Sequence, residues 1–194
     1  MDLDRRTHWI FDMDGTLTVP LHDFAWLRAQ LHIRPDQDIL QALAERPPER
    51  AAADQTFIAA WEDGLARRAQ AQQDAQVLLE SLSARGCRLG ILTRNTLVGT
   101  HTTLEAAGLA RWFRPQDRVG RDTAPPKPDP AGVHHLLRAW GVGPEVAVVV
   151  GDWIHDVRAG KRAGAAAVLV RRHGPQPWER EADRVVEDLR ELVG

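Results

Sequence analysis

The chain has 194 residues, of which 43% are hydrophobic, enough for one core and a small accessory module. A formal net charge of −2 argues against a basic surface for nucleic acid, and no apolar run is long enough to span a membrane. Cys87 is the single cysteine, which excludes an internal disulfide, and residues 1–6 are charged, unlike a signal peptide, so we expect a cytoplasmic protein.

The first predicted strand ends in a pair of carboxylates. Residues 9–11 are apolar, as expected of a buried parallel strand, and Asp12 follows directly, with Asp14 two positions later. Side chains two apart along a strand face the same side, so these two aspartates can converge on one substrate or ion. Gly15 permits a tight turn close to a ligand. The alternative, an ordinary strand-to-turn junction, is disfavoured by the polar residues that end the later strands.

Residues 18–76 contain no convincing strand and are predicted to be helical. The expected helices cover residues 23–31, then a segment capped by Asp36 or Asp38 that ends at residue 44, then residues 49–71. This pattern predicts a helical insertion, with the α/β core in residues 1–17 and 77–194. Four polar residues of the insertion are candidates for substrate contact, with an ordinary surface position as the alternative for each: His22, Arg28, His32 and Arg34.

Helices and strands alternate after the insertion, which predicts an α/β fold with a parallel sheet covered by helices on both faces. A helix starts near Asp74, and Asp129 is expected to cap another, with Pro130 at its first position. Residues 185–186 are expected to form a short last strand before a C-terminal helix. The remaining elements are a strand at 88–92, a helix at 97–107, a loop, a helix at 130–140, a strand at 146–150, a helix at 156–163 and a strand at 166–170.

Two candidate phosphate-binding segments lie in the second half of the chain. Thr93, Arg94 and Asn95 follow the predicted strand 88–92, where a hydroxyl and backbone N–H groups can hold a phosphate oxygen. The alternative for Thr93 is to cap the next helix. Lys127 is one of only two lysines among 25 basic residues, and the prolines on both sides hold its backbone stiffly. Such a lysine is an unusual choice for an ordinary solvated loop.

The most apolar predicted strand, residues 146–150, runs into Gly151 and Asp152, and Asp156 follows four residues later. Burying a carboxylate at the end of such a strand is unfavourable unless it meets a cation. The position of Asp152 therefore favours a cation site.

Together these motifs resemble those of the haloacid dehalogenase superfamily, in its phosphatase branch. The matching residues are, in motif order, Asp12 with Asp14, Thr93, Lys127, and Asp152 with Asp156. The third and fourth motifs are also similar to those of the phosphoglycolate phosphatase-like subgroup, and the helical insertion resembles the cap of this superfamily. The resemblance implies a Rossmann-like parallel sheet. Trp153 departs from the small residue usual at its position, which affects the expected shape of the phosphate pocket.

The resemblance also implies a Mg²⁺ cofactor and a role for each matching residue. Asp12 would bind the metal and attack phosphorus, and Asp14 would bind the metal through its backbone carbonyl and transfer protons through its side chain. Asp152 would be a direct metal ligand, and Asp156 would orient a metal-bound water or Lys127. The substrate phosphate would contact Gly15, Thr93, Arg94, Asn95 and Lys127, of which Thr93 and Lys127 would also be catalytic.

Three functions remain open at this point. The first is a Mg²⁺-dependent phosphatase that acts on a small phosphorylated metabolite, such as phosphoglycolate or a sugar phosphate, through an aspartyl phosphate. The second is a phosphomutase of the β-phosphoglucomutase type, and the third is a non-catalytic binding protein. The filled catalytic positions argue against the third. The substrate and the oligomeric state are not determined.

Overall fold

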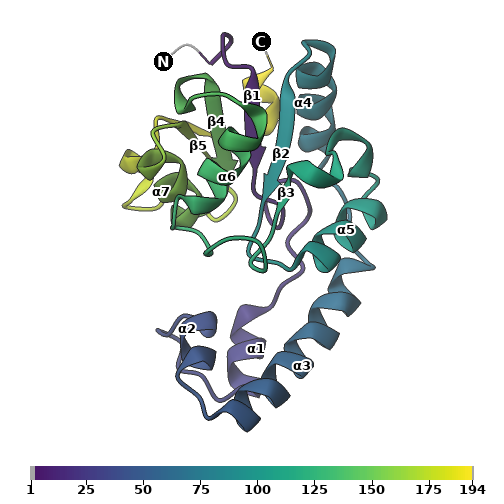
Figure 1. The fold of residues 1–194 in the computed structure, drawn as a ribbon, viewed down its shortest axis with the longest axis vertical. Coiled ribbons are helices and arrows are strands. Elements are labelled where there is room, and N and C mark those ends of the chain that lie inside the picture. The colour runs from purple at the N-terminus through teal and green to yellow at the C-terminus, as the bar shows by residue number, and fades with distance from the viewer. Residues whose placement is uncertain (1–2, 194) are drawn as a thin grey trace.

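A computed structural model describes residues 3–193. Six parallel strands form one sheet in the order β3-β2-β1-β4-β5-β6, so the predicted parallel α/β fold is confirmed (Figure 1). The strands are β1 (His8–Phe11), β2 (Arg88–Leu92), β3 (Arg118–Val119), β4 (Ala147–Gly151), β5 (Ala166–Val170) and β6 (Arg184–Val186). The first strand lies in the middle of the sheet, between β2 and β4, and it therefore places Asp12 centrally.

Helices cover both faces of the sheet because successive strand residues point to opposite sides. Trp9 and Phe11 belong to one apolar cluster, which also includes residues of α4 (Gln73–Ala84) and α5 (Leu97–Ala106). Ile10, between them, belongs to a second cluster with residues of α6 (Ala131–Trp140) and α7 (Ile154–Arg162). Within residues 3–193, five short 3₁₀ turns connect these elements: Ala110–Trp112, Pro115–Asp117, Pro144–Val146, Glu179–Glu181 and Leu189–Leu192.

The remaining helices, α1 (Phe24–Gln30), α2 (Ile39–Ala44) and α3 (Pro48–Ala66), lie beyond the sheet at the lower end of the molecule (Figure 1). They enclose a separate small cluster that includes Leu27, Leu43 and Ile58. Asp23 caps α1 by accepting a hydrogen bond from the Trp26 N–H at 2.8 Å. Of the two candidate caps for α2, Asp38 is the one that accepts the bond from the helix, from the Gln41 N–H.

The third helix ends at Ala66, not at residue 71 as predicted, because the chain after it pairs with the chain before α1. The Val19 N–H donates to the Gln70 carbonyl, and the Gln72 N–H donates to the Leu17 carbonyl, each at 2.9 Å. These bonds hold the two connections between the helices and the sheet side by side. We call this paired segment, residues 17–19 and 70–72, the hinge ribbon.

Other boundaries also differ from the predictions. The strand β3 falls in the predicted loop, since its two residues are too few to show a strand pattern. The Asp129 side chain accepts a hydrogen bond from the Ala131 N–H, as a helix cap does. The helix α6 nevertheless begins at Ala131, one residue later than predicted. The expected C-terminal helix is only the 3₁₀ turn Leu189–Leu192. The strand β4 begins at Ala147, one residue late, and α7 begins at Ile154, two residues early.

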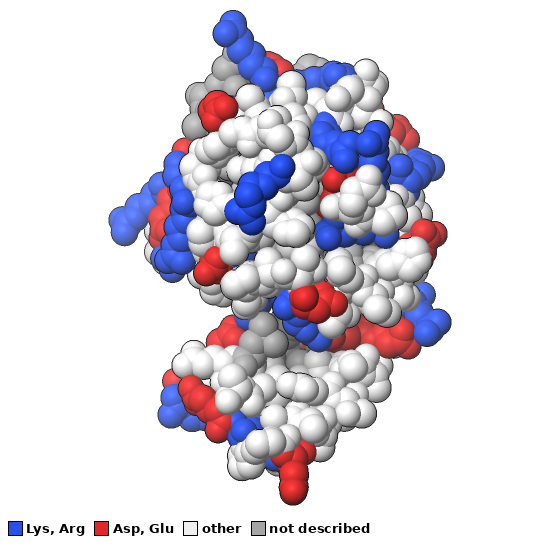
Figure 2. Space-filling model, in the orientation of Figure 1, with Lys and Arg blue, Asp and Glu red and all other residues white. Residues whose placement is uncertain are grey.

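Acidic and basic side chains are both scattered over the face of the molecule seen in Figure 2. Among residues 3–193, no helix is long and apolar enough to cross a membrane.

Candidate active site

The candidate site lies where the strand order reverses direction between β1 and β4. Asp12 follows β1, Asp152 follows β4, and these strands are neighbours, so the two carboxylates meet at the same edge of the sheet. Open α/β sheets bind ligands in the crevice at this reversal point, at the carboxyl ends of the strands. The sheet thus brings together residues that are 140 positions apart in the chain.

Lys127 joins the carboxylates of the site. Its Nζ lies 2.5 Å from Asp12 Oδ1 and 2.5 Å from Asp156 Oδ1, and all three side chains are largely buried. Burial raises the pKa of Asp12 to about 6, against the opposing effect of the Lys127 charge. Burial also raises the pKa of Asp152 and of Asp156 above its ordinary value. The single ammonium group therefore leaves an excess of negative charge in the site.

This excess fits a hard cation. Oxygens of Asp12, Asp152 and Asp156 all lie within 4.8 Å of one another. Carboxylate oxygens are the ligands that Mg²⁺ prefers, and such a donor set without nitrogen or sulfur ligands is typical of its sites. The donor set of the described residues thus agrees with the metal expected from the sequence.

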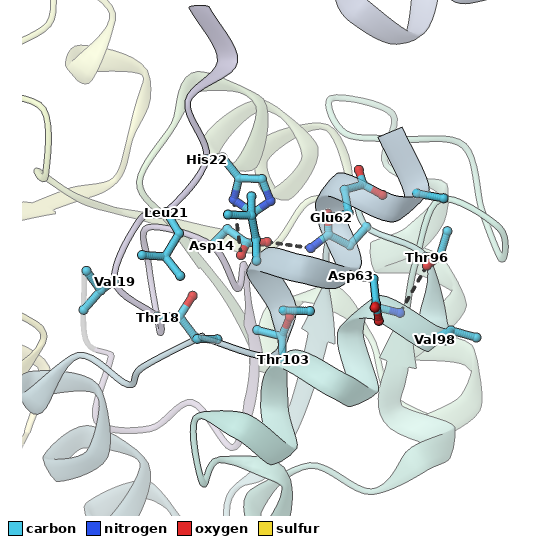
Figure 3. A pocket seen from close by; sticks show the side chains of 16 residues that line it. Asp14, Thr18, Val19, Leu21, His22, Glu62, Asp63, Thr96, Val98 and Thr103 are labelled. Atoms are coloured by element: carbon cyan, nitrogen blue, oxygen red, sulfur yellow. Dashed lines mark hydrogen bonds and ion pairs between the residues drawn. The ribbon is translucent and has the colours of Figure 1, made fainter. Parts of the chain in front are cut away.

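Asp14 has different surroundings from Asp12. The Asn95 side-chain amide donates to Asp14 Oδ2 at 2.8 Å, and His22 Nδ1 lies 3.7 Å from Asp14 Oδ1, with the ring turned toward the carboxylate (Figure 3). Burial, followed by the charge of Asp12, raises the pKa of Asp14 to about 7. Burial lowers the pKa of His22, so this imidazole is mostly neutral at neutral pH. Asp14 is thus able to release and take up a proton near neutral pH, as a general acid and base must.

The residues predicted to bind phosphate have several different partners. Thr93 is buried, and its hydroxyl accepts a hydrogen bond from the Asn95 N–H at 3.2 Å. Arg94 Nη2 donates to Asp38 Oδ2, at the start of α2, at 2.7 Å. The Gly15 N–H donates to the Thr18 carbonyl at 3.0 Å. The structure therefore brings Lys127 to the cluster and Asn95 to Asp14, and gives Arg94 and the Gly15 N–H other partners.

Gly15 is required by the packing of the site. Its φ of +87° lies in the left-handed region, and a Cβ at this position would lie 2.5 Å from Asp152 Oδ2. The glycine thus allows the loop after β1 to pass directly against the aspartate that follows β4.

The sequence comparison decides the family. The haloacid dehalogenase-like hydrolase family model matches residues 8–164. The chain belongs to this family. A haloacid dehalogenase-like hydrolase domain-containing protein of Arabidopsis thaliana is 32% identical over 87% of this chain and 74% of its own length. A phosphoglycolate phosphatase of Rhodospirillum rubrum is 32% identical over 83% of this chain and 78% of its own.

The fold of this hydrolase agrees with its family. The crystal structure of a hydrolase from Pseudomonas syringae superposes with a TM-score of 0.78, at 26% identity, and the match covers 96% of each chain. The predicted resemblance to the haloacid dehalogenase superfamily, and to its phosphoglycolate phosphatase-like members, is thus confirmed, as is the prediction that the chain is an enzyme.

Two residues of the hydrolase site were not predicted. The Thr16 hydroxyl donates to Asp152 Oδ1 at 3.1 Å and lies 3.4 Å from Asp12 Oδ2. His173 Nε2 lies 2.8 Å from Asp152 Oδ2, so the imidazole holds the other oxygen of this carboxylate. Thr16 belongs to the first motif, and His173 follows β5, the neighbour of β4. His173 could not be placed at the site from the sequence, because the sequence does not show that β5 lies beside β4.

Trp153, the departure from the subgroup pattern, packs edge-to-face against His173 and Trp178, with ring centroids 5.6 Å apart in both pairs. The Trp153 ring therefore packs against the same imidazole that contacts Asp152.

Of the four cap residues considered as substrate contacts, His22 lines a cavity of about 240 Å³ next to Asp14. Arg28 donates to the carbonyls of Phe24 and Gln37, and Arg34 bonds Asp36, so both arginines are held within the cap helices. His32 is not among the residues that line this cavity.

Proposed function

We propose that this hydrolase is a Mg²⁺-dependent phosphatase that cleaves a small phosphomonoester through an aspartyl phosphate on Asp12. The observation that carries the proposal is that two carboxylates of one loop have different surroundings. Asp12 lies on the Lys127 ammonium, whereas Asp14 has a pKa raised to about 7. The relatives named phosphoglycolate phosphatase support a phosphomonoester substrate.

The metal would be held by Asp12, Asp152 and the backbone carbonyl of Asp14. When bound, Mg²⁺ supplies positive charge that offsets the repulsion between the phosphoryl group and an attacking carboxylate. Asp156 lies 2.5 Å from Lys127 Nζ, so its role in the proposal is to hold the ammonium group in place. Lys127, with the Thr93 hydroxyl, would stabilise charge on the phosphoryl oxygens.

The reaction would proceed in two displacements at phosphorus. A carboxylate oxygen of Asp12 forms a bond to phosphorus while the bond to the ester oxygen breaks, and Asp14 gives its proton to the departing alkoxide. Asp14, now ionised, takes a proton from a water molecule, and the resulting hydroxide attacks the phosphorus of the aspartyl phosphate. The bond to Asp12 breaks, phosphate leaves, and both aspartates return to their first states.

We also propose that residues 18–72 serve as a cap that moves about the hinge ribbon and contacts the leaving group. The predicted boundary at residue 76 lies inside α4, which packs on the sheet. The separate apolar cluster of α1–α3 supports a unit able to move as one body. Small phosphorylated metabolites would be the substrates. The lone Cys87 agrees with the proposal of a reducing, cytoplasmic location.

The test uses p-nitrophenyl phosphate and two variants. The purified protein should release free phosphate in Mg²⁺ and lose this activity in a chelator, whereas a phosphomutase would isomerise sugar phosphates without net release. Asp12→Asn should lose turnover, and Asp14→Asn should lose about 10²–10⁴-fold. Rapid quench and mass measurement should find phosphate on Asp12 in the Asp14 variant. Full turnover by Asp12→Asn would exclude the covalent mechanism.

A further inference from the structure

The cavity beside Asp14 offers a space for the leaving group. It has a volume of about 240 Å³ and is lined by apolar and polar side chains, most of them from α3, α5 and residues 18–22. Because Asp14 and Asn95 also line it, the cavity borders the side chain that would protonate the departing oxygen. The alcohol part of a substrate is therefore expected to lie here while the phosphoryl group lies on Asp12.

The charges of this cavity are unfavourable for an anion. Three carboxyl groups line it, those of Asp14, Glu62 and Asp63, of which Glu62 is paired with Arg121 and Asp63 with Arg67. Among the described residues, none of its lining side chains is a lysine or an arginine. His22 is the one lining residue with an imidazole, and its Nδ1 lies beside Asp14.

The two arginines that reach toward the cap are already paired with carboxylates. Arg121 makes a two-pronged ion pair with Glu62 of α3, each nitrogen lying 2.8 Å from a different oxygen. Both side chains are mostly buried, with 23% and 18% of their surface exposed. Arg94 bonds Asp38 at 2.7 Å. A buried, two-pronged pair of this kind is costly to break, so Arg121 is poorly available to an anionic leaving group.

We propose that the leaving group of the natural substrate is a small alcohol that carries no negative charge, and that Glu62 excludes carboxylate-bearing esters by holding Arg121. This inference rests on the proposed phosphatase function. It separates the chain from relatives that are named for phosphoglycolate, an ester with a carboxylate in its leaving group. The leaving-group cavity of this chain has acidic and apolar walls.

Three two-carbon esters test the charge alone: 2-phosphoglycolate, 2-hydroxyethyl phosphate and 2-aminoethyl phosphate. They share one phosphoryl group and carry a carboxylate, a hydroxyl and an ammonium group at the same position. Each is measured as a competitive inhibitor of p-nitrophenyl phosphate hydrolysis, which gives a binding constant whether or not the ester is cleaved. We expect 2-phosphoglycolate to bind at least about tenfold more weakly than 2-hydroxyethyl phosphate, because like charges oppose each other in the cavity.

The variant Glu62→Gln should reduce the ratio of the binding constants of these two esters by at least about threefold. The reason is that the substitution releases Arg121 to meet the carboxylate. Glu80→Gln is the matched control, since Glu80 also faces an arginine but lies on the exposed side of α4. Equal or tighter binding of 2-phosphoglycolate by the wild type would overturn the charge assignment. An unchanged ratio of the two binding constants in Glu62→Gln would overturn the role of Glu62. Absence of any wild-type turnover would instead overturn the phosphatase function itself.

Discussion

Replacement of Asp14 by asparagine should stabilise the metal-free protein at alkaline pH. The folded protein raises the pKa of this carboxyl from 3.8 to about 7, so its ionised form is disfavoured by burial and by Asp12. A shift of about three units corresponds to about 4 kcal/mol. Since 26% of the side chain is exposed and solvent screens part of the charge, we expect roughly half, about 2 kcal/mol. Asparagine has nearly the same shape and can still accept the Asn95 hydrogen bond.

The gain should depend on pH in a defined direction. Between about pH 4 and pH 7 the folded protein keeps the Asp14 proton while the unfolded chain has lost it, so wild-type stability falls as the pH rises through this window. The variant has no such group to titrate and avoids this fall. Its advantage should therefore be nearly absent at pH 4 and complete above pH 7, and at pH 5 less than half of the full value.

Urea unfolding and thermal unfolding, both followed by tryptophan fluorescence in EDTA at about pH 5 and pH 8, measure this difference. At pH 8 the melting temperature should rise by roughly 4–8 °C, given about 2–4 °C per kcal/mol for a chain of this size. Asp63→Asn is the control, because Asp63 is half exposed on α3 and pairs only with Arg67 in the described residues. An Asp14 variant no more stable than the wild type at pH 8, or equally stabilised at both pH values, would refute the reasoning.

Three further predictions concern the contacts around the site. The substitution His173→Gln should weaken Mg²⁺ binding about tenfold in calorimetry, because the imidazole orients Asp152; unchanged affinity would show that this contact is incidental. The substitution Asp74→Ala should lower the free energy of unfolding by about 2–3 kcal/mol, because it leaves the mostly buried Arg172 without its carboxylate; a loss below about 0.5 kcal/mol in urea unfolding would contradict this. Gly15→Ala should cost about 1–3 kcal/mol in the same assay, from its positive φ and its clash with Asp152, and wild-type stability would contradict the clash.

The sequence by itself determined the elements whose signals are local. Apolar runs that end in Asp12 and Asp152 predict two buried strands with carboxylates at their ends, and the structure has both. A strand buried on two faces needs a continuous apolar stretch, so its position is written in a few consecutive residues. Helix caps such as Asp38 are local for the same reason, since the side chain bonds a backbone N–H three residues away. The family also followed from short motifs in order along the chain.

Only the tertiary structure decided which distant residues meet. The third helix ends at Ala66 because Gln70 pairs with Val19 in the hinge ribbon, a contact that no pattern within the helix reveals. His173 reaches Asp152 because β5 lies beside β4 in the sheet. Such pairings depend on strand order and on how the helical insertion packs against the rest of the chain. Both are set by contacts between segments far apart in the sequence. A local pattern does not determine that packing. It specifies which face of an element is buried but not which partner covers that face.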